Sequence, residues 1–174
     1  MKKILLLLFL TGYITTAFAQ KVISVEKASD HSTYVKGDDF EGVIFDKEYK
    51  RLSNWVDSTL KRFTPTIEDI QLAETILNRQ LKDTYKKNLN KYVRSNSAAV
   101  HFNLNQYCRQ YFGYYDKHGK KIIFLNCFPT GDEQYTRNWK SFLHVGLDGG
   151  MAYWRAEINL SEGTLFGFNT NGFA

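Results

Sequence analysis

The chain has 174 residues, of which 16% are aromatic and only two are proline. Its formal net charge is +5 at pH 7, and the basic residues are scattered along the chain, which disfavours a nucleic-acid-binding protein. This length suits one domain with a hydrophobic core of its own, and a composition rich in Tyr and Phe but poor in Pro favours a sheet-rich fold.

The first 19 residues have the pattern of a secretory signal peptide. Lys2 and Lys3 form a basic start, Ile4 to Leu10 is a short apolar run, and Ala17-Phe18-Ala19 is a small-x-small cleavage signal. The apolar run is shorter than the roughly 20 residues that a membrane-spanning helix needs. We therefore expect residues 1–19 to be removed, which leaves a secreted or periplasmic protein of 155 residues (174 minus 19) without an integral membrane segment.

Residues 20–63 are predicted to form an N-terminal segment of short strands with one short helix. Val22 to Val25 and Val43 to Phe45 are short apolar runs bounded by turn-like residues, which is typical of edge strands. Apolar residues recur at helical spacing between Lys47 and Lys61, so a short helix is predicted there.

A long amphipathic helix is predicted from Thr64 onward, with Thr64 as its N-cap and Pro65 at the first helical position. About 20 residues at 1.5 Å each give a helix of roughly 30 Å, long enough to cross several strands of a sheet. Its apolar stripe recurs at three- and four-residue steps, and we expect it to pack on that sheet. The stripe consists of Ile67, Ile70, Ala73, Leu77, Leu81 and Tyr85, widened by Leu72 and Ile76.

Residues 107–128 predict a β-hairpin, because two aromatic-rich runs flank the polar segment Asp116-Lys117-His118-Gly119. With that segment as the turn, Tyr115 faces Lys120 and Cys108 faces Cys127. Two cysteines brought together in an exported protein are expected to form a disulfide. The alternative is two reduced, buried cysteines that act as small apolar side chains. Their spacing matches no zinc motif, so no metal site is expected.

A second hairpin is predicted around Asp148-Gly149-Gly150-Met151, with strands over Phe142 to Asp148 and Ala152 to Leu160. In this register apolar residues oppose apolar residues on one face. The other face carries Tyr153, Arg155, Glu157 and Asn159 in strict alternation, which is typical of a sheet with one buried and one wet face. Leu165 to Phe168 is predicted to be the last strand.

A long helix followed by consecutive strands over residues 64–174 predicts an α+β fold, in which the helix packs on an antiparallel meander of four to five strands. Residues 20–174 are expected to form one globular domain. The element order resembles the cystatin-like arrangement, which nuclear-transport-factor-2-like domains share. The cystatin inhibitory signature is absent, since Gln20 to Ser24 lacks its Gly and no later Pro-Trp occurs, so protease inhibition is not implied. The motifs RQYFGY, FLNCF, DGG and a terminal NG-x-A are similar to those of a group of short exported bacterial proteins.

One face of the first hairpin suggests a binding function. Tyr107, Arg109, Tyr111 and Tyr115 share that face, and Tyr and Arg are enriched at recognition hot spots. We expect this face to be covered by residues 20–60 or by a second copy in a homodimer, or else to bind a protein, peptide or glycan. The predicted function is a non-enzymatic binding module with no cofactor.

The alternative function is a small hydrolase or isomerase with a His/acid pair in a pocket between sheet and helix. In the predicted second hairpin His144 lies near Glu157 and Asp148, so that an acid could tune the imidazole. The sequence contains no nucleophile-elbow, zinc-protease or phosphate-loop motif.

Overall fold

The computed structural model describes residues 20–51, 57, 59–92, 103–131, 137–146 and 149–171. The predicted signal peptide over residues 1–19 lies outside these residues. Most of the short helix predicted between Lys47 and Lys61 lies outside them as well, and the described parts of that range contain no helix.

The described chain forms eight strands, one long helix and two short 3-10 turns. The strands are β1 (Val22–Ser29), β2 (Ser32–Gly37), β3 (Glu41–Phe45), β4 (Arg62–Phe63), β5 (Tyr107–Tyr115), β6 (Lys121–Pro129), β7 (Trp154–Asn159) and β8 (Thr164–Thr170). The helix is α1 (Ile67–Tyr92), and the 3-10 turns are Leu104–Gln106 and Gly150–Ala152.

All eight strands belong to one sheet with the order β1-β2-β3-β5-β6-β7-β8, and β4 pairs with the end of β5 beyond β3. Neighbouring strands are antiparallel except β3 and β5, which run parallel because α1 lies between them in the chain. The predicted α+β fold with a helix on an antiparallel meander is confirmed, and β5 to β8 form that meander.

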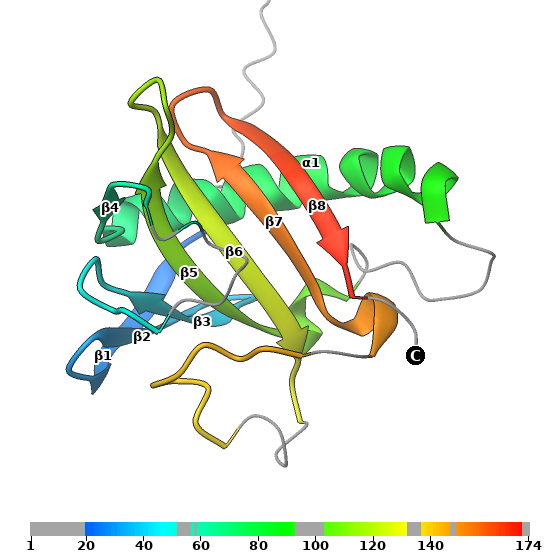
Figure 1. The fold of residues 1–174 in the computed structure, drawn as a ribbon. Helices are drawn as coiled ribbons and strands as arrows, with labels where there is room; N and C mark the ends of the chain where they lie inside the picture. Colours follow the sequence, from blue (N-terminus) through cyan, green and yellow to red (C-terminus); the bar gives the residue numbers. More distant parts are fainter. Residues whose placement is uncertain are drawn as a thin grey trace, which may run out of the picture.

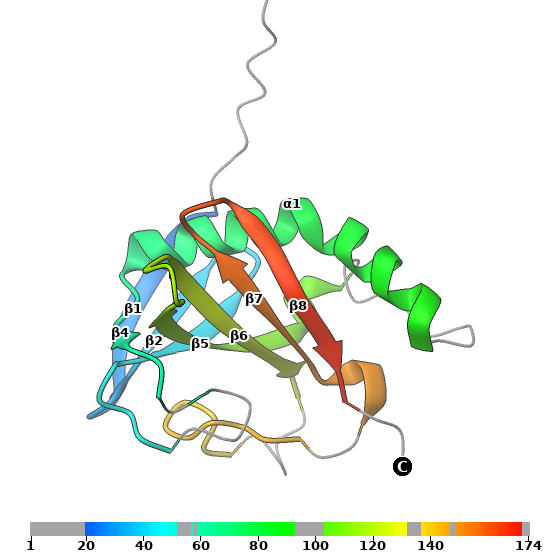
Figure 2. The same ribbon diagram turned by 45° about the horizontal axis from the view of Figure 1, so that its top comes forward.

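The molecule has three layers (Figures 1 and 2). In Figure 1, α1 crosses behind the meander, and in Figure 2 the sheet lies between α1 and the loops of the opposite side. Two apolar clusters match these layers: one fills the space between α1 and the sheet, and the other lies on the opposite face under the loops. Both faces of the central strands are therefore covered by the chain itself.

The helix begins two residues later than the sequence pattern indicates. Thr66, not Thr64, is the N-cap: its hydroxyl accepts a hydrogen bond from Asp69 N–H at 3.2 Å, and the Asp69 carboxylate accepts one from Thr66 N–H at 3.1 Å. This reciprocal pair is a capping box with Asp in the place of the usual Glu. Thr64 instead accepts a hydrogen bond from Lys47 N–H, which fastens the preceding loop.

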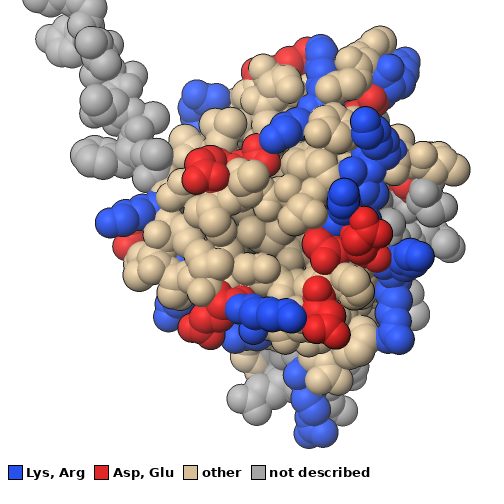
Figure 3. Space-filling model, turned by 90° about the vertical axis from the view of Figure 1, so that its left-hand side faces the viewer, with Lys and Arg blue, Asp and Glu red and all other residues tan. Residues whose placement is uncertain are grey.

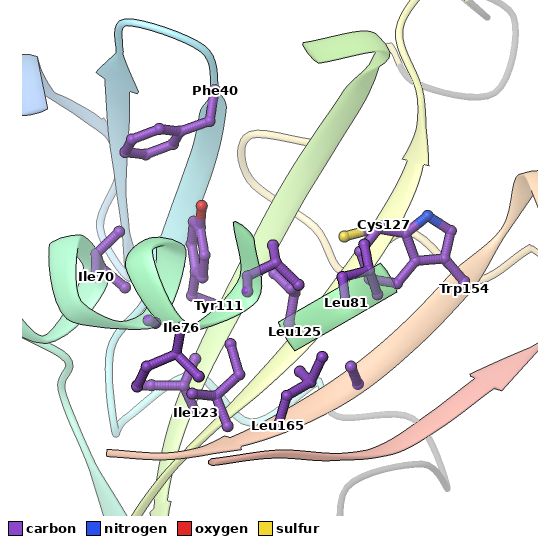
Figure 4. Packing of buried hydrophobic residues seen from close by; sticks show 14 of the residues in the cluster. Phe40, Ile70, Ile76, Leu81, Tyr111, Ile123, Leu125, Cys127, Trp154 and Leu165 are labelled. Carbon is purple, nitrogen blue, oxygen red and sulfur yellow. The ribbon is translucent and has the colours of Figure 1, made fainter. Parts of the chain in front are cut away.

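The apolar stripe of α1 packs against the sheet, as its spacing predicts. Ile70, Leu77 and Leu81 are fully buried, and Figure 4 shows helix residues lying over side chains of β5 and β6 such as Leu125. Leu72, which was expected to widen the stripe, is 44% exposed because it lies on the opposite side of the helix.

The register of the first hairpin differs from the predicted one by one residue. Tyr115 opposes Lys121, and Asp116 N–H donates to Lys120 O at 3.0 Å, so the loop is three residues, 117–119, rather than four. Asp116 accepts hydrogen bonds from the N–H groups of His118 and Lys120, and Gly119 has φ +76°. This is a type I turn closed by a left-handed glycine, a favoured three-residue hairpin loop.

This shift separates the two cysteines. Cys108 opposes Phe128 and faces away from α1, whereas Cys127 opposes Arg109 and faces α1. Because a one-residue slip turns one strand's side chains to the other face, the predicted disulfide is wrong. Both thiols are free and buried.

The second predicted hairpin is wrong in one of its two strands, the one predicted over Phe142 to Asp148. Residues 142–146 form no strand, and β7 pairs with β6 and β8 instead. The alternation itself is confirmed: Trp154, Ala156 and Ile158 are buried toward α1, and Glu157 lies on the other face.

The two edges of the sheet are irregular. β1 carries bulges near both ends, between Val22 and Ser24 and between Lys27 and Ser29, so only its centre pairs regularly. β8 carries a bulge next to Gly167, whose φ of +61° suits glycine.

Replacing Leu77 by Ala tests the packing of α1. We expect the free energy of unfolding to fall by about 2–5 kcal/mol, because a fully buried leucine leaves a cavity. Leu72→Ala, on the exposed side of the same helix, should change it by less than about 0.5 kcal/mol. Urea denaturation measures both, and equal effects would show that α1 does not pack through this stripe.

The state of the two cysteines can be tested by mass spectrometry and thiol titration. The protein should have the same mass with and without reductant, and the unfolded chain should react as two thiols. In the folded protein, the pKa of Cys108 is raised to about 12, mainly by burial and secondly by the Glu41 carboxylate. Alkylation of Cys108 at pH 8 should therefore occur only after the protein unfolds. An unreduced mass lower by two hydrogens would contradict the register given above.

Candidate functional site

The predicted binding strip lies in the interior. Arg109 and Tyr111 are 1% and 0% exposed, because the face of β5 on which they lie packs against α1. Tyr107 and Tyr115 are half-buried and pack edge-on or tilted against Trp154 and Phe63. These four side chains therefore do not form an open recognition surface.

Arg109 and Tyr111 instead meet a buried carboxylate from α1. Glu74 is 1% exposed, its Oε1 lies 3.1 Å from Arg109 Nε, and Tyr111 donates a hydrogen bond to the same oxygen at 2.8 Å. The two terminal nitrogens of Arg109 donate to the carbonyl oxygens of Tyr107 and Leu104 at 3.0 and 3.1 Å. One guanidinium thus ties α1, β5 and the 3-10 turn before β5 together.

Burial disfavours the charged form of Glu74 and of Arg109, and the opposite charge of the partner favours it. Burial raises the pKa of Glu74, while Arg109 and the Tyr111 hydrogen bond act to lower it. For Arg109, burial lowers the pKa and the Glu74 carboxylate raises it, with a net increase. The sequence holds a signal for Glu74 that the prediction missed: it lies four residues after Ile70 and three before Leu77, so an acid sits on the apolar stripe.

The strand that the sequence pattern predicts over Phe142 to Asp148, on which the alternative catalytic site depends, does not form over the described residues 142–146, and the His/acid pair stays a prediction. The His144 ring lies 4.4 Å from the Phe128 ring centroid and stacks on Tyr153 at 5.6 Å. Glu157 accepts a hydrogen bond from the Tyr114 hydroxyl. Asp148 lies outside the described residues.

The face of the sheet away from α1 is covered by residues 137–146, which we call the strap. Gln110 on β5 is fully buried, and both the nitrogen and the oxygen of its side-chain amide form hydrogen bonds with the strap. Its nitrogen donates to the carbonyl oxygens of Trp139 and Phe142 at 2.7 and 2.8 Å, and its oxygen accepts from His144 N–H at 2.9 Å. A side-chain amide here takes the place of a neighbouring strand's backbone.

Further contacts fix the strap along its length. Asn126 on β6 donates to Gln110 Oε1 at 3.0 Å and to His144 O at 2.8 Å. Leu143 N–H donates to the hydroxyl of Tyr49 at 2.9 Å, and the Ser32 hydroxyl donates to Lys140 O at 2.6 Å. The strap therefore has a defined position, and so do the side chains it presents at its ends.

A cleft of about 680 Å³ lies where the strap meets the turn between β1 and β2. Residues 29–31 and 48–51 form two of its walls, and Ser141 and Phe142 of the strap form the third. Phe142 is 42% exposed, and the guanidinium of Arg51 lies 5.0 Å from its ring centroid. The volume is within the range of small-ligand pockets.

His31, in the wall of the cleft, pairs with the carboxylate of Asp46, which lies outside the lining; the sequence pattern singles out neither residue. His31 Nδ1 lies 3.1 Å from Asp46 Oδ2, and Asp46 also accepts hydrogen bonds from the N–H groups of Glu48 and Tyr49. Ser29 contacts the backbone N–H of His31, and its hydroxyl lies 2.6 Å from that of Ser32. Because Ser32 donates to Lys140 O, Ser29 donates to Ser32, which is not the arrangement of a serine activated by a histidine.

The charged residues on the side of the molecule shown in Figure 3 are mixed in sign. On the side shown in Figure 3, Lys and Arg are interspersed with Asp and Glu around an uncharged centre, unlike the concentrated basic face of a nucleic-acid-binding protein. Among the described residues, no three His, Cys, Asp or Glu side chains gather in a group that could hold a metal ion. Within the same part of the chain, no helix has the length and apolar character to cross a membrane.

Comparisons of the chain with protein-family models, curated proteins and solved structures give no match. The cystatin-like arrangement and the similarity to short exported bacterial proteins therefore stay predictions.

Removing the buried carboxylate tests the network around Arg109. Glu74→Ala should lower the free energy of unfolding by about 3–5 kcal/mol, because the Arg109 charge is left buried and unpaired. The double variant Glu74→Leu with Arg109→Met replaces both charges by apolar groups of similar size and should recover much of that loss. Urea denaturation of the single and double variants measures the coupling. A loss below about 1 kcal/mol in Glu74→Ala would contradict a buried ion pair.

Proposed function

We propose that this protein is an exported, non-enzymatic binding module, and that the cleft beside the strap recognises a peptide segment of a partner protein. The observation that carries the proposal is the half-exposed Phe142 with Arg51 above its ring, at the mouth of a cleft of about 680 Å³. Aromatic and arginine side chains dominate the binding energy of protein interfaces when a pocket holds them.

The rest of the sheet supports this location. The central strands are covered by α1 on one face and by loops and the strap on the other, so their aromatic side chains are used within the fold. The cleft walls combine acidic, basic, hydroxyl and aromatic groups, which suits the alternating backbone and side-chain groups of a peptide. The Ser29 hydroxyl is directed to Ser32 rather than to the imidazole, which supports binding over nucleophilic hydrolysis.

Rigid attachment also favours recognition at this point. Gln110 holds the backbone of Phe142 directly, because its amide nitrogen donates a hydrogen bond to the Phe142 carbonyl oxygen at 2.8 Å. A binding residue that is already held in place loses less entropy when a ligand arrives.

The proposal can be tested with an array of random-sequence peptides probed by the purified protein. Phe142→Ala should reduce binding to the selected peptides by about tenfold, the size expected for losing an aromatic anchor. Because this side chain is 42% exposed, the melting temperature should change little.

Val145→Ala is the matched control, since Val145 belongs to the same strap and is 43% exposed but does not line the cleft. It should leave peptide binding unchanged. An array without any bound peptide, or equal losses in the two variants, would refute the cleft as the binding site.

A further inference from the structure

We infer that the cleft selects an anionic peptide, in which a carboxylate pairs with Lys50 and Arg51 while an apolar side chain lies against Phe142. This inference rests on the proposed function and adds to it the chemical class of the ligand. It follows from the charges that line the cleft and from the position of Arg51 over the Phe142 ring.

The acidic side chains at the cleft already have basic neighbours. Asp30 lies 3.2 Å from the ammonium of Lys27, and Glu48 lies 4.0 Å from that of Lys47. The Asp46 carboxylate is occupied by His31 and by two backbone N–H groups. Each of these carboxylates therefore already has a partner within the chain.

The basic side chains of the cleft, by contrast, have no ion-pair partner among the described residues. Lys50 and Arg51 are both exposed, and neither has a carboxylate within ion-pair distance in the part of the chain that the structure describes. Two adjacent positive charges without a counter-charge attract an anion. A carboxylate is the group of a peptide that supplies one.

The contact between Arg51 and Phe142 sets the spacing of the two ligand groups. The guanidinium carbon lies 5.0 Å from the ring centroid, so an anion on Arg51 and an apolar group on the ring are neighbours. An extended chain advances about 3.3–3.6 Å per residue, which places the carboxylate and the apolar side chain one or two residues apart. The planar guanidinium also suits bidentate pairing with a carboxylate, which an ammonium cannot provide.

Fluorescence anisotropy with three labelled peptides tests this inference. The acidic probe is acetyl-Gly-Ser-Glu-Phe-Ser-Gly-amide, and the neutral and basic probes carry Gln or Lys in place of Glu. We expect the acidic probe to bind at least about tenfold more tightly than either, and its affinity to fall when salt rises from about 0.05 to 0.5 M. A fourth probe, the neutral sequence with a free carboxyl terminus, distinguishes a terminal carboxylate from a side-chain carboxylate as the group bound.

Substitution of Lys50 and Arg51 tests whether these two cations cause the preference for the acidic probe. Arg51→Gln and Lys50→Gln should each weaken binding of the acidic probe about three- to tenfold more than binding of the neutral probe, and should reduce the salt dependence of the acidic probe. Arg51→Lys keeps the charge but should still bind more weakly than the natural chain. Lys117→Gln, an exposed lysine in the turn between β5 and β6 and outside the cleft, is the matched control and should have no effect.

Equal affinity for the acidic, neutral and basic probes would overturn the inference and leave the proposed function standing. The same conclusion holds if none of these probes binds while peptides selected on the array do bind at Phe142. If the array also yields no peptide, the proposed function fails, and the inference fails with it.

Discussion

The turn at residues 117–119 is the constraint on which the rest of the structure depends. Its three-residue length, closed by Gly119 in the left-handed region, decides which side chains of β6 share a face of the sheet with which side chains of β5. With this register Arg109 and Tyr111 face α1, and Gln110 and Asn126 face the strap. A loop longer by one residue would turn the side chains of β6 to the opposite face relative to β5, and would separate Asn126 from Gln110 and from the strap.

Both faces of the sheet therefore use buried polar side chains, but in different ways. Toward α1, an ion pair supported by a tyrosine hydroxyl joins Glu74 and Arg109 inside an apolar cluster. Away from α1, the uncharged amides of Gln110 and Asn126 bind the strap without the desolvation of a full charge. The first arrangement fixes the helix and the connection before β5, and the second fixes one wall of the cleft.

Local patterns in the sequence predict much of this fold. The period of the α1 stripe and the alternation of Trp154, Ala156 and Ile158 identify the faces that are buried. The prediction failed where two regular patterns had to be aligned. The turn could have been assigned correctly, because Asp116 and Gly119 are the residues that a type I turn prefers at its first and fourth positions. The cleft could not be predicted, since one of its walls, Ser141 and Phe142, begins 90 residues after Arg51 (141 minus 51) and no local pattern links Arg51 to Phe142.

The bulges of β1 bear on how the molecule behaves when it is concentrated. β1 is one edge of the sheet, and its apolar Ile23 and Val25 are 61% and 50% exposed, a combination that favours pairing with strands of other molecules. The two irregularities confine the straight part of this edge to residues 24–27, among which Glu26 and Lys27 are charged. So short and charged an edge is a poor template for a growing fibril, which protects the chain from amyloid-like assembly.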